Sequence, residues 1–189
     1  MKQAKVLSDQ EVKRVLAVIG QERHPERNRM AFMLSYLAGM RACEISGLVV
    51  GDVIDTQGKP KSEIRLVASK TKGQTGRTVM VGEKLQREIT HYSATLVSME
   101  TTRPLLPSQK SGRHFSANTL VQLFQRLYAL AGIDGASSHS GRRSFITNLA
   151  SKGVGARVLQ HLAGHSSLAT TQRYIDVNDH QLRAAANLM

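Results

Sequence analysis

The stretch GHSSLATTQRYID, Gly164 to Asp176, runs through small and polar residues to a tyrosine, Tyr174, that directly follows an arginine. A phenol hydroxyl can attack an electrophile, and its anion also leaves readily, because the reference pKa of a phenol is about 10, far below that of an alkanol. The residues that accompany this tyrosine along the chain therefore indicate both the fold and the chemistry.

Size and charge limit the classes of protein to consider. A chain of 189 residues can bury one sizeable core, so we expect a single compact domain over residues 1–189. Lys and Arg outnumber Asp and Glu by 26 to 14, which gives a net charge of +12. Such a charge predicts a polyanionic partner, and the dispersal of the basic residues favours nucleic acid over a membrane surface.

Other features of the chain argue against a membrane or secreted protein. The apolar stretch that begins at Met30 falls well short of the ~20 residues that span a bilayer. The amino terminus lacks the hydrophobic block of a secretory signal, and the lone Cys43 cannot form an internal disulfide. These features predict a cytoplasmic protein in which Cys43 is a small buried hydrophobe.

Hydrophobic periodicity predicts a mainly helical protein with one small antiparallel sheet, an α+β fold. Ser8 and Glu11 form a capping box for a helix that begins at about Asp9. Strand-like alternation and glycines fill 52–81. Further helices are expected over 27–39, 42–48 and 85–96, from Ser116 to Gly132, and as three or four short helices broken near Gly153, Gly164 and Asp176.

Several polar residues stand where these elements begin or end. Arg41 lies at the end of an apolar helix, with Glu44 three residues later and close enough to orient it. Lys70 and Lys72 lie at a glycine-rich hairpin tip, and His139 and Arg142 are spaced to share a helix face. The candidate site residues are Arg41, Lys72, His139, Arg142, His165 and Tyr174.

Together these residue types suit phosphoryl transfer without a metal. Arginines can clamp the non-bridging oxygens of a phosphodiester and neutralise the charge that builds in the transition state. A tyrosine hydroxyl can attack the phosphorus, while a protonated lysine can supply a proton to the departing sugar oxygen. Counting back from Arg77 and the strand that follows favours Lys72 over Lys70 for this role.

At these six positions the chain resembles the tyrosine recombinases, also called phage integrases. The matching motifs are GMRACEISGL, TKGQTGRTVMV, HSGRRSF, LAGH and TTQRYI, and the resemblance runs from about Val6 to Asp176. It implies the catalytic-domain fold of that family, with Tyr174 as the nucleophile. It also implies a 3′-phosphotyrosyl intermediate on double-stranded DNA, a protein that is monomeric when free and tetrameric on DNA, and no cofactor or metal.

Two departures from the family pattern affect these expectations. Family members typically carry an additional amino-terminal domain that grips the opposite side of the DNA, and this sequence begins with the capped helix of the catalytic domain. It is either a naturally short form or an excised catalytic domain. The second departure is Gly141, where many relatives have leucine, and we expect it to loosen the packing beneath Arg142.

Alternative interpretations remain open. His161 and His165 could form a zinc pair, but no HExxH pattern or cysteine cluster supplies further ligands. A DNA-binding regulatory module of the same fold without strand exchange is a second function class. A DNA-relaxing enzyme of the type IB topoisomerase kind is a third. The tail 177–189 must dock to be ordered, either on its own domain or, as the resemblance suggests, on a neighbouring protomer.

Overall fold

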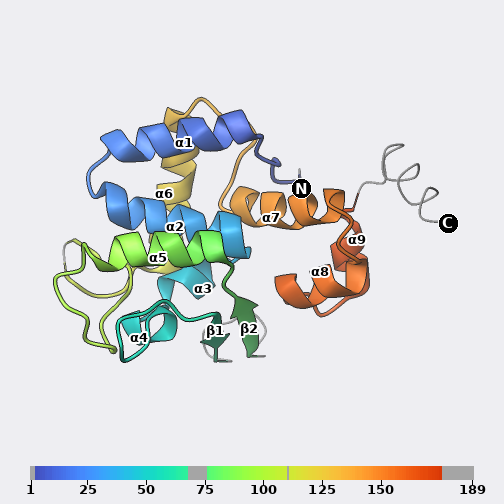
Figure 1. Cartoon of the computed structure of the whole chain (residues 1–189). Coiled ribbons are helices and arrows are strands. Elements are labelled where there is room, and N and C mark those ends of the chain that lie inside the picture. The colour runs from blue at the N-terminus through green and yellow to red at the C-terminus, as the bar shows by residue number, and fades with distance from the viewer. Residues whose placement is uncertain (1–2, 68–75, 110, 176–189) are drawn as a thin grey trace.

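The computed structural model describes residues 3–67, 76–109 and 111–175, which form a mainly helical fold with a small antiparallel sheet (Figure 1). Lys70, Lys72, Asp176 and the tail 177–189 lie outside the described residues. The elements in chain order are α1 (Asp9–Gln21), α2 (Pro25–Ala38), α3 (Ala42–Ser46), α4 (Val50–Val53), β1 (Glu63–Leu66), β2 (Arg77–Met80), α5 (Glu83–Ser93), α6 (Ala117–Leu130), α7 (Ser140–Ser151), α8 (Ala156–Ala163) and α9 (Leu168–Gln172).

Helix α2 lies at the centre of the fold. Met30, Ala31, Phe32, Met33 and Leu34 are consecutive in sequence and all buried, so this helix is covered on every side. Helices α1, α3, α5 and α7 pack around it, while α7, α8 and α9 follow one another at the orange and red end of the chain (Figure 1). None of the described helices is long and apolar enough to cross a membrane.

The predicted helix starts and stops are largely confirmed. Ser8 and Glu11 form the capping box of α1, and the Ser116 hydroxyl accepts a hydrogen bond from the Thr119 amide at the start of α6. Gly164 ends α8 in the left-handed conformation, with φ of 61°, which a residue without a side chain adopts readily. Helix α2 begins at Pro25, two residues before the predicted start, because proline is well suited to the first helical turn.

The sheet is the two-stranded hairpin β1–β2, with Glu63 opposite Met80 and Leu66 opposite Arg77. The strand-like pattern predicted from residue 52 was wrong at its start, because Val50–Val53 forms the short helix α4. A run of four residues is too short for helical periodicity to show in the sequence. The Asp52 carboxylate caps this turn by accepting a hydrogen bond from the Val49 amide. The helix predicted over 85–96 ends at Ser93.

The expectation that Gly141 loosens the packing beneath Arg142 was wrong. A Cβ atom at Gly141 would lie 2.6 Å from Oγ of Ser35 on α2, and a Cβ atom at Gly39 would lie 2.5 Å from Cδ1 of Phe145 on α7. The two glycines thus let α2 and α7 approach closely, so that the Gly39 carbonyl is within reach of Arg142. The packing here is tight because Ser35 fills the space that a larger residue at 141 would need.

Candidate active site

The candidate site is built around the carboxy-terminal end of α8. The last carbonyls of a helix have no partner within the helix and carry the negative end of its dipole. Here three of them each accept a hydrogen bond from a different arginine. Arg77 Nη1 lies 2.9 Å from the Leu162 carbonyl oxygen, Arg142 Nη2 lies 2.5 Å from that of Ala163, and Arg41 Nη2 lies 3.4 Å from that of Gly164.

Arg142 projects from the first turn of α7 and is 4% exposed. Besides Ala163, its guanidinium binds the Gly39 carbonyl, with Nη1 2.6 Å from the oxygen. Burial lowers the pKa of Arg142 to about 9, and the charges of Arg41 and Arg77 contribute to this decrease. Arg142 therefore remains protonated at neutral pH, and it lies in a cluster of like charges that an anion would relieve.

Arg41 is held as the sequence predicted. It precedes α3, and its amide nitrogen and its Nη1 lie 2.8 and 2.9 Å from the two oxygens of Glu44. Glu44 is fully buried, and its other donor is Arg77, which binds both carboxylate oxygens. Burial raises the pKa of Glu44, but the hydrogen bonds and charges of Arg77 and Arg41 outweigh burial and hold it below its usual value. One carboxylate thus orients two arginines.

His165 and Tyr174 lie against each other. Their rings are stacked, with centroids 5.6 Å apart and planes 24° apart. The Nδ1 atom of His165 lies 3.0 Å from Oγ1 of the buried Thr171, which fixes the orientation of the imidazole. Short helix α9 supplies Thr171, and the turn after α9 brings Tyr174 back beside the end of α8.

His165 is expected to be a neutral imidazole in the free protein. Burial lowers the pKa of His165 to about 4, and Arg142, Arg41 and Arg77 add to this effect through their charges. A neutral ring can donate one hydrogen bond and accept another. If the Thr171 hydroxyl donates to Nδ1, then Nε2 carries the proton and can donate to an oxygen of a bound phosphate.

This shift predicts a dependence of stability on pH. Because the folded-state pKa lies below the unfolded value of about 6.5, the unfolded chain binds more protons as the pH falls, and stability decreases. Between pH 7 and pH 5 the His165 contribution should fall by about 2 kcal/mol. Urea unfolding of the wild type and of His165→Gln at both pH values measures the difference. Parallel pH slopes for the two proteins would contradict the assignment.

His139 was predicted to share a helix face with Arg142, and the structure places it one residue before the helix, as the N-cap of α7. His139 is exposed, whereas Arg142, in the first turn, is buried. The backbone amide of His139 lies 3.3 Å from Oγ of Ser137. Cys43, expected to be buried, is only partly so. Among the described residues, no three His, Cys, Asp or Glu side chains come together in a way that could hold a metal ion.

Sequence reasoning missed three residues that contact the predicted set. Arg77 and Thr171 hold Glu44 and His165, and the guanidinium carbon of Arg143 lies 5.6 Å from the centroid of the Tyr174 ring. The sequence did contain a signal for Arg77, because it is a charged residue at a strand position whose neighbours on the same side of the sheet are apolar. Arg143 follows Arg142 directly, and nothing in its own sequence context distinguishes it from a surface arginine.

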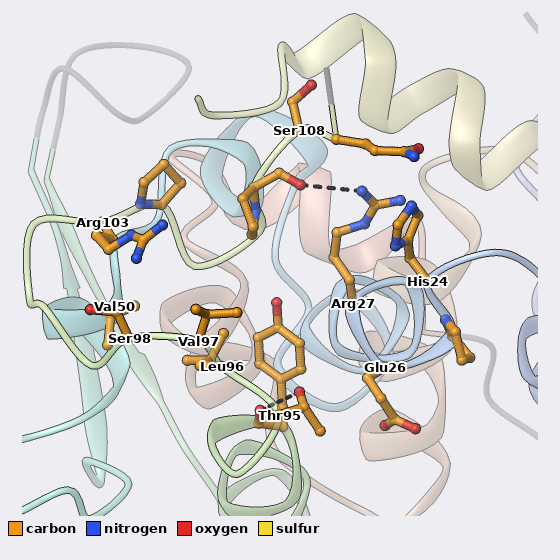
Figure 2. Close-up of a pocket in the computed structure, with 15 residues that line it drawn as sticks. His24, Glu26, Arg27, Val50, Thr95, Leu96, Val97, Ser98, Arg103 and Ser108 are labelled. Atoms are coloured by element: carbon orange, nitrogen blue, oxygen red, sulfur yellow. Dashed lines mark hydrogen bonds between the residues drawn. The ribbon is translucent and has the colours of Figure 1, made fainter. Parts of the chain in front are cut away.

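One pocket adjoins the candidate site, and another lies away from it. One, of 440 Å³, lies between β2 and α8, beside the candidate site, and is lined by Gly76, Arg77, Thr78, Met80, Gln160, His161, Leu162, Gly164 and His165. The other, of 360 Å³, lies at the amino-terminal end of α2, where Arg27 Nη1 binds the Pro107 carbonyl at 3.2 Å (Figure 2). This second pocket contains none of the predicted site residues, because the candidate site lies at the other end of α2. A helix of 14 residues is roughly 20 Å long.

Comparison with known proteins agrees with this fold. The model of the phage integrase family matches residues 5–181. The tyrosine recombinase XerA of Thermococcus kodakarensis is 34% identical over 182 residues, which are 96% of this chain and 61% of that protein. The tyrosine recombinase XerC of Mycobacterium bovis is 35% identical over 162 residues, 84% of this chain and 52% of that protein.

Solved structures give the same result. The crystal structure of XerA recombinase matches with a TM-score of 0.75 and 26% identity, over 98% of this chain and 66% of that one. The Tn1549 transposon integrase in complex with circular intermediate DNA has the same fold, with a TM-score of 0.73 at 17% identity, over 99% of this chain and 67% of that one.

The chain belongs to the phage integrase family, as the match over most of its length shows. It spans somewhat over half the length of the curated relatives that it matches.

Proposed function

We propose that this chain is the catalytic domain of a site-specific recombinase of the integrase or invertase type, which cuts and rejoins double-stranded DNA. The observation that carries the proposal is the arrangement at the end of α8, where Arg41 and Arg142 converge beside the stacked rings of His165 and Tyr174. A net charge of +12 suits a polyanionic substrate. Relatives named tyrosine recombinases support the same reaction class.

In the proposed reaction, the Tyr174 hydroxyl oxygen forms a bond to phosphorus while the bond from phosphorus to the 5′ oxygen breaks. The phenol gives up its proton to solvent water, and the departing 5′ oxygen takes one from Lys72. A 3′-phosphotyrosyl ester and a free 5′-hydroxyl result. Attack by another 5′-hydroxyl reverses these steps and rejoins the strand, so no external energy source is needed.

The remaining residues stabilise the transition state in this proposal. Arg41 and Arg142 bind the non-bridging oxygens, on which negative charge increases, and His139 and His165 add hydrogen bonds. Because Glu44 and the α8 carbonyls already fix the arginines, little reorganisation is needed when the phosphate arrives. Glu44 acts only through the arginines that it orients.

Covalent trapping tests this function. A nicked suicide substrate taken from the genomic neighbourhood loses the short fragment after cleavage, so the phosphotyrosyl ester cannot be resealed. We expect a protein–DNA band that survives denaturation and also forms in the presence of EDTA. Site-specific binding without any such band would instead indicate a regulatory module, and relaxation of supercoiled DNA without site preference would indicate a topoisomerase.

The proposal includes assembly as a tetramer on DNA, with the carboxy-terminal tail 177–189 docked on a neighbouring protomer. Truncation after Asp176 should then leave binding to one half-site nearly intact while it reduces cooperative complexes and recombinant product. Gel shifts and recombination assays on the full and truncated chains measure the two effects. Normal higher-order complexes and normal product yield from the truncated chain would exclude this role of the tail.

A further inference from the structure

Arg77 is a charged residue on the inward side of the hairpin. Arg77 is the first residue of β2 and pairs with Leu66 of β1. The side chains of Leu66 and Val79, which lie on the same side of the hairpin as Arg77, are buried. The Arg77 side chain is itself only 10% exposed. A buried guanidinium is costly unless its donors are all well paired, so this position calls for specific partners.

Those partners are two parts of the candidate site. Nε and Nη2 of Arg77 bind the two oxygens of Glu44 at 3.0 and 2.8 Å, in the paired geometry that a planar guanidinium allows. Nη1 binds the Leu162 carbonyl oxygen at 2.9 Å. Glu44 also accepts a hydrogen bond from Arg41, so this carboxylate links Arg77 to Arg41. Leu162, in turn, lies three residues before His165.

The contact with α8 is close as well as polar. Gly164 has a φ of 61°, and any side chain at this position would run into the aliphatic stem of Arg77. Arg77 therefore fixes the height of the last turn of α8 above the hairpin. In the same turn, the Ala163 and Gly164 carbonyls bind Arg142 and Arg41.

We propose that Arg77 is a positioning residue for strand cleavage. From its place on β2, Arg77 sets the direction of the Arg41 guanidinium through Glu44. It also sets the position of His165 through the Leu162 carbonyl. The inference rests on the proposed recombinase function. Arg77 contacts no reacting atom in this role. It makes the hairpin part of the active site, so that a displacement of β2 displaces Arg41 and His165 together.

Single-turnover cleavage of the suicide substrate tests this role. Arg77→Ala should bind DNA within about threefold of the wild type but cleave about 100-fold more slowly, the order of loss that small misplacements of catalytic groups cause. Arg77→Lys keeps the charge beside Glu44 but cannot also reach Leu162, so it should recover part of the rate, to about 10-fold below the wild type. The lysine variant also serves if the alanine variant does not fold.

A matched control is available on another pair of elements. Arg29 of α2 binds both oxygens of Glu88 on α5, with both distances 2.7 Å, in the same paired geometry. Arg29→Ala removes a comparable ion pair away from the candidate site. Arg29→Ala should lower thermal stability slightly, because a partly exposed ion pair contributes only a small free energy to folding. The cleavage rate should stay within about twofold of the wild type, because this pair contacts no described residue of the candidate site.

A neutral substrate distinguishes positioning from folding. Replacing one non-bridging oxygen of the scissile phosphate by a methyl group removes the charge that Arg41 neutralises. The Arg77→Ala deficit should therefore shrink from about 100-fold to about 10-fold on the methylphosphonate, as should that of Arg41→Ala. A folding defect would lower both rates equally.

Two results would overturn the inference while leaving the proposed function in place. One is wild-type cleavage by Arg77→Ala under conditions in which Arg41→Ala is slowed about 100-fold. The other is an equal deficit on both substrates together with a lowered melting temperature, which would assign Arg77 a structural role alone. A wild-type protein that forms no adduct with either substrate would overturn the proposed function, and the inference with it.

Discussion

Tyr174→Phe is expected to bind DNA as tightly as the wild type and to form no covalent adduct. The substitution removes only the hydroxyl, so the ring can remain stacked on His165 and close to the Arg143 guanidinium. Without an attacking oxygen there is no phosphotyrosyl ester, and the loss of cleavage should reach the detection limit. Gel shifts measure binding, and denaturing electrophoresis after incubation with the suicide substrate measures the adduct.

Tyr36→Phe provides the matched control, because it removes the hydroxyl of a partly buried tyrosine that stacks on Phe32 in α2. It should form the adduct at a wild-type rate. An adduct with Tyr174→Phe would show that another residue attacks the phosphorus, and the site would then have to be reassigned.

Arg41→Ala is expected to slow cleavage on the order of 100-fold, equivalent to about 3 kcal/mol in the barrier, with little change in stability. Stability should be kept because the buried Glu44 retains Arg77 as its partner after Arg41 is removed. Single-turnover cleavage and thermal unfolding measure the two quantities. Cleavage by Arg41→Ala at the wild-type rate would remove Arg41 from the phosphate-binding set.

Arg142 should behave differently, because it supports the fold as well as the chemistry. Its guanidinium satisfies the buried carbonyls of Gly39 and Ala163. Arg142→Ala leaves both unpaired at a cost of about 1 to 3 kcal/mol for each group. We expect a comparable loss of cleavage together with a clear drop in melting temperature, so Arg142→Lys is the better variant for separating the two effects.

Local sequence signals were sufficient for most elements of the fold. Capping residues such as Ser8 and Ser116 act within one turn of their helices, and Gly164 ends α8 through its own backbone conformation. The pair of Arg41 and Glu44 was predictable for the same reason, since three residues separate them. The short helix α4 was not, because four residues carry no periodic pattern.

The tertiary part of the site could not be predicted in this way. Arg77 meets Glu44 across 33 positions of the chain, and Arg142 meets Gly39 across 103. Nothing within a window of sequence indicates such pairs. The tight contact of Gly141 with Ser35 is of the same kind, and a comparison of residue size at position 141 alone suggested the opposite.

The cluster at the end of α8 also has a consequence for directed evolution. Arg41 and Arg77 bind a single buried carboxylate, Glu44, whereas Arg142 binds the backbone carbonyls of Gly39 and Ala163. Burial lowers the pKa of Arg142, and the charges of the other two arginines lower it further. A neutral side chain in place of Arg142 leaves two buried carbonyls unpaired and so costs stability as well as function. One in place of Arg41 costs function alone, because Glu44 keeps Arg77 as its partner. A library of variants selected for heat resistance alone would therefore retain Arg142 but would not protect Arg41, and such selections should alternate with a screen for recombination.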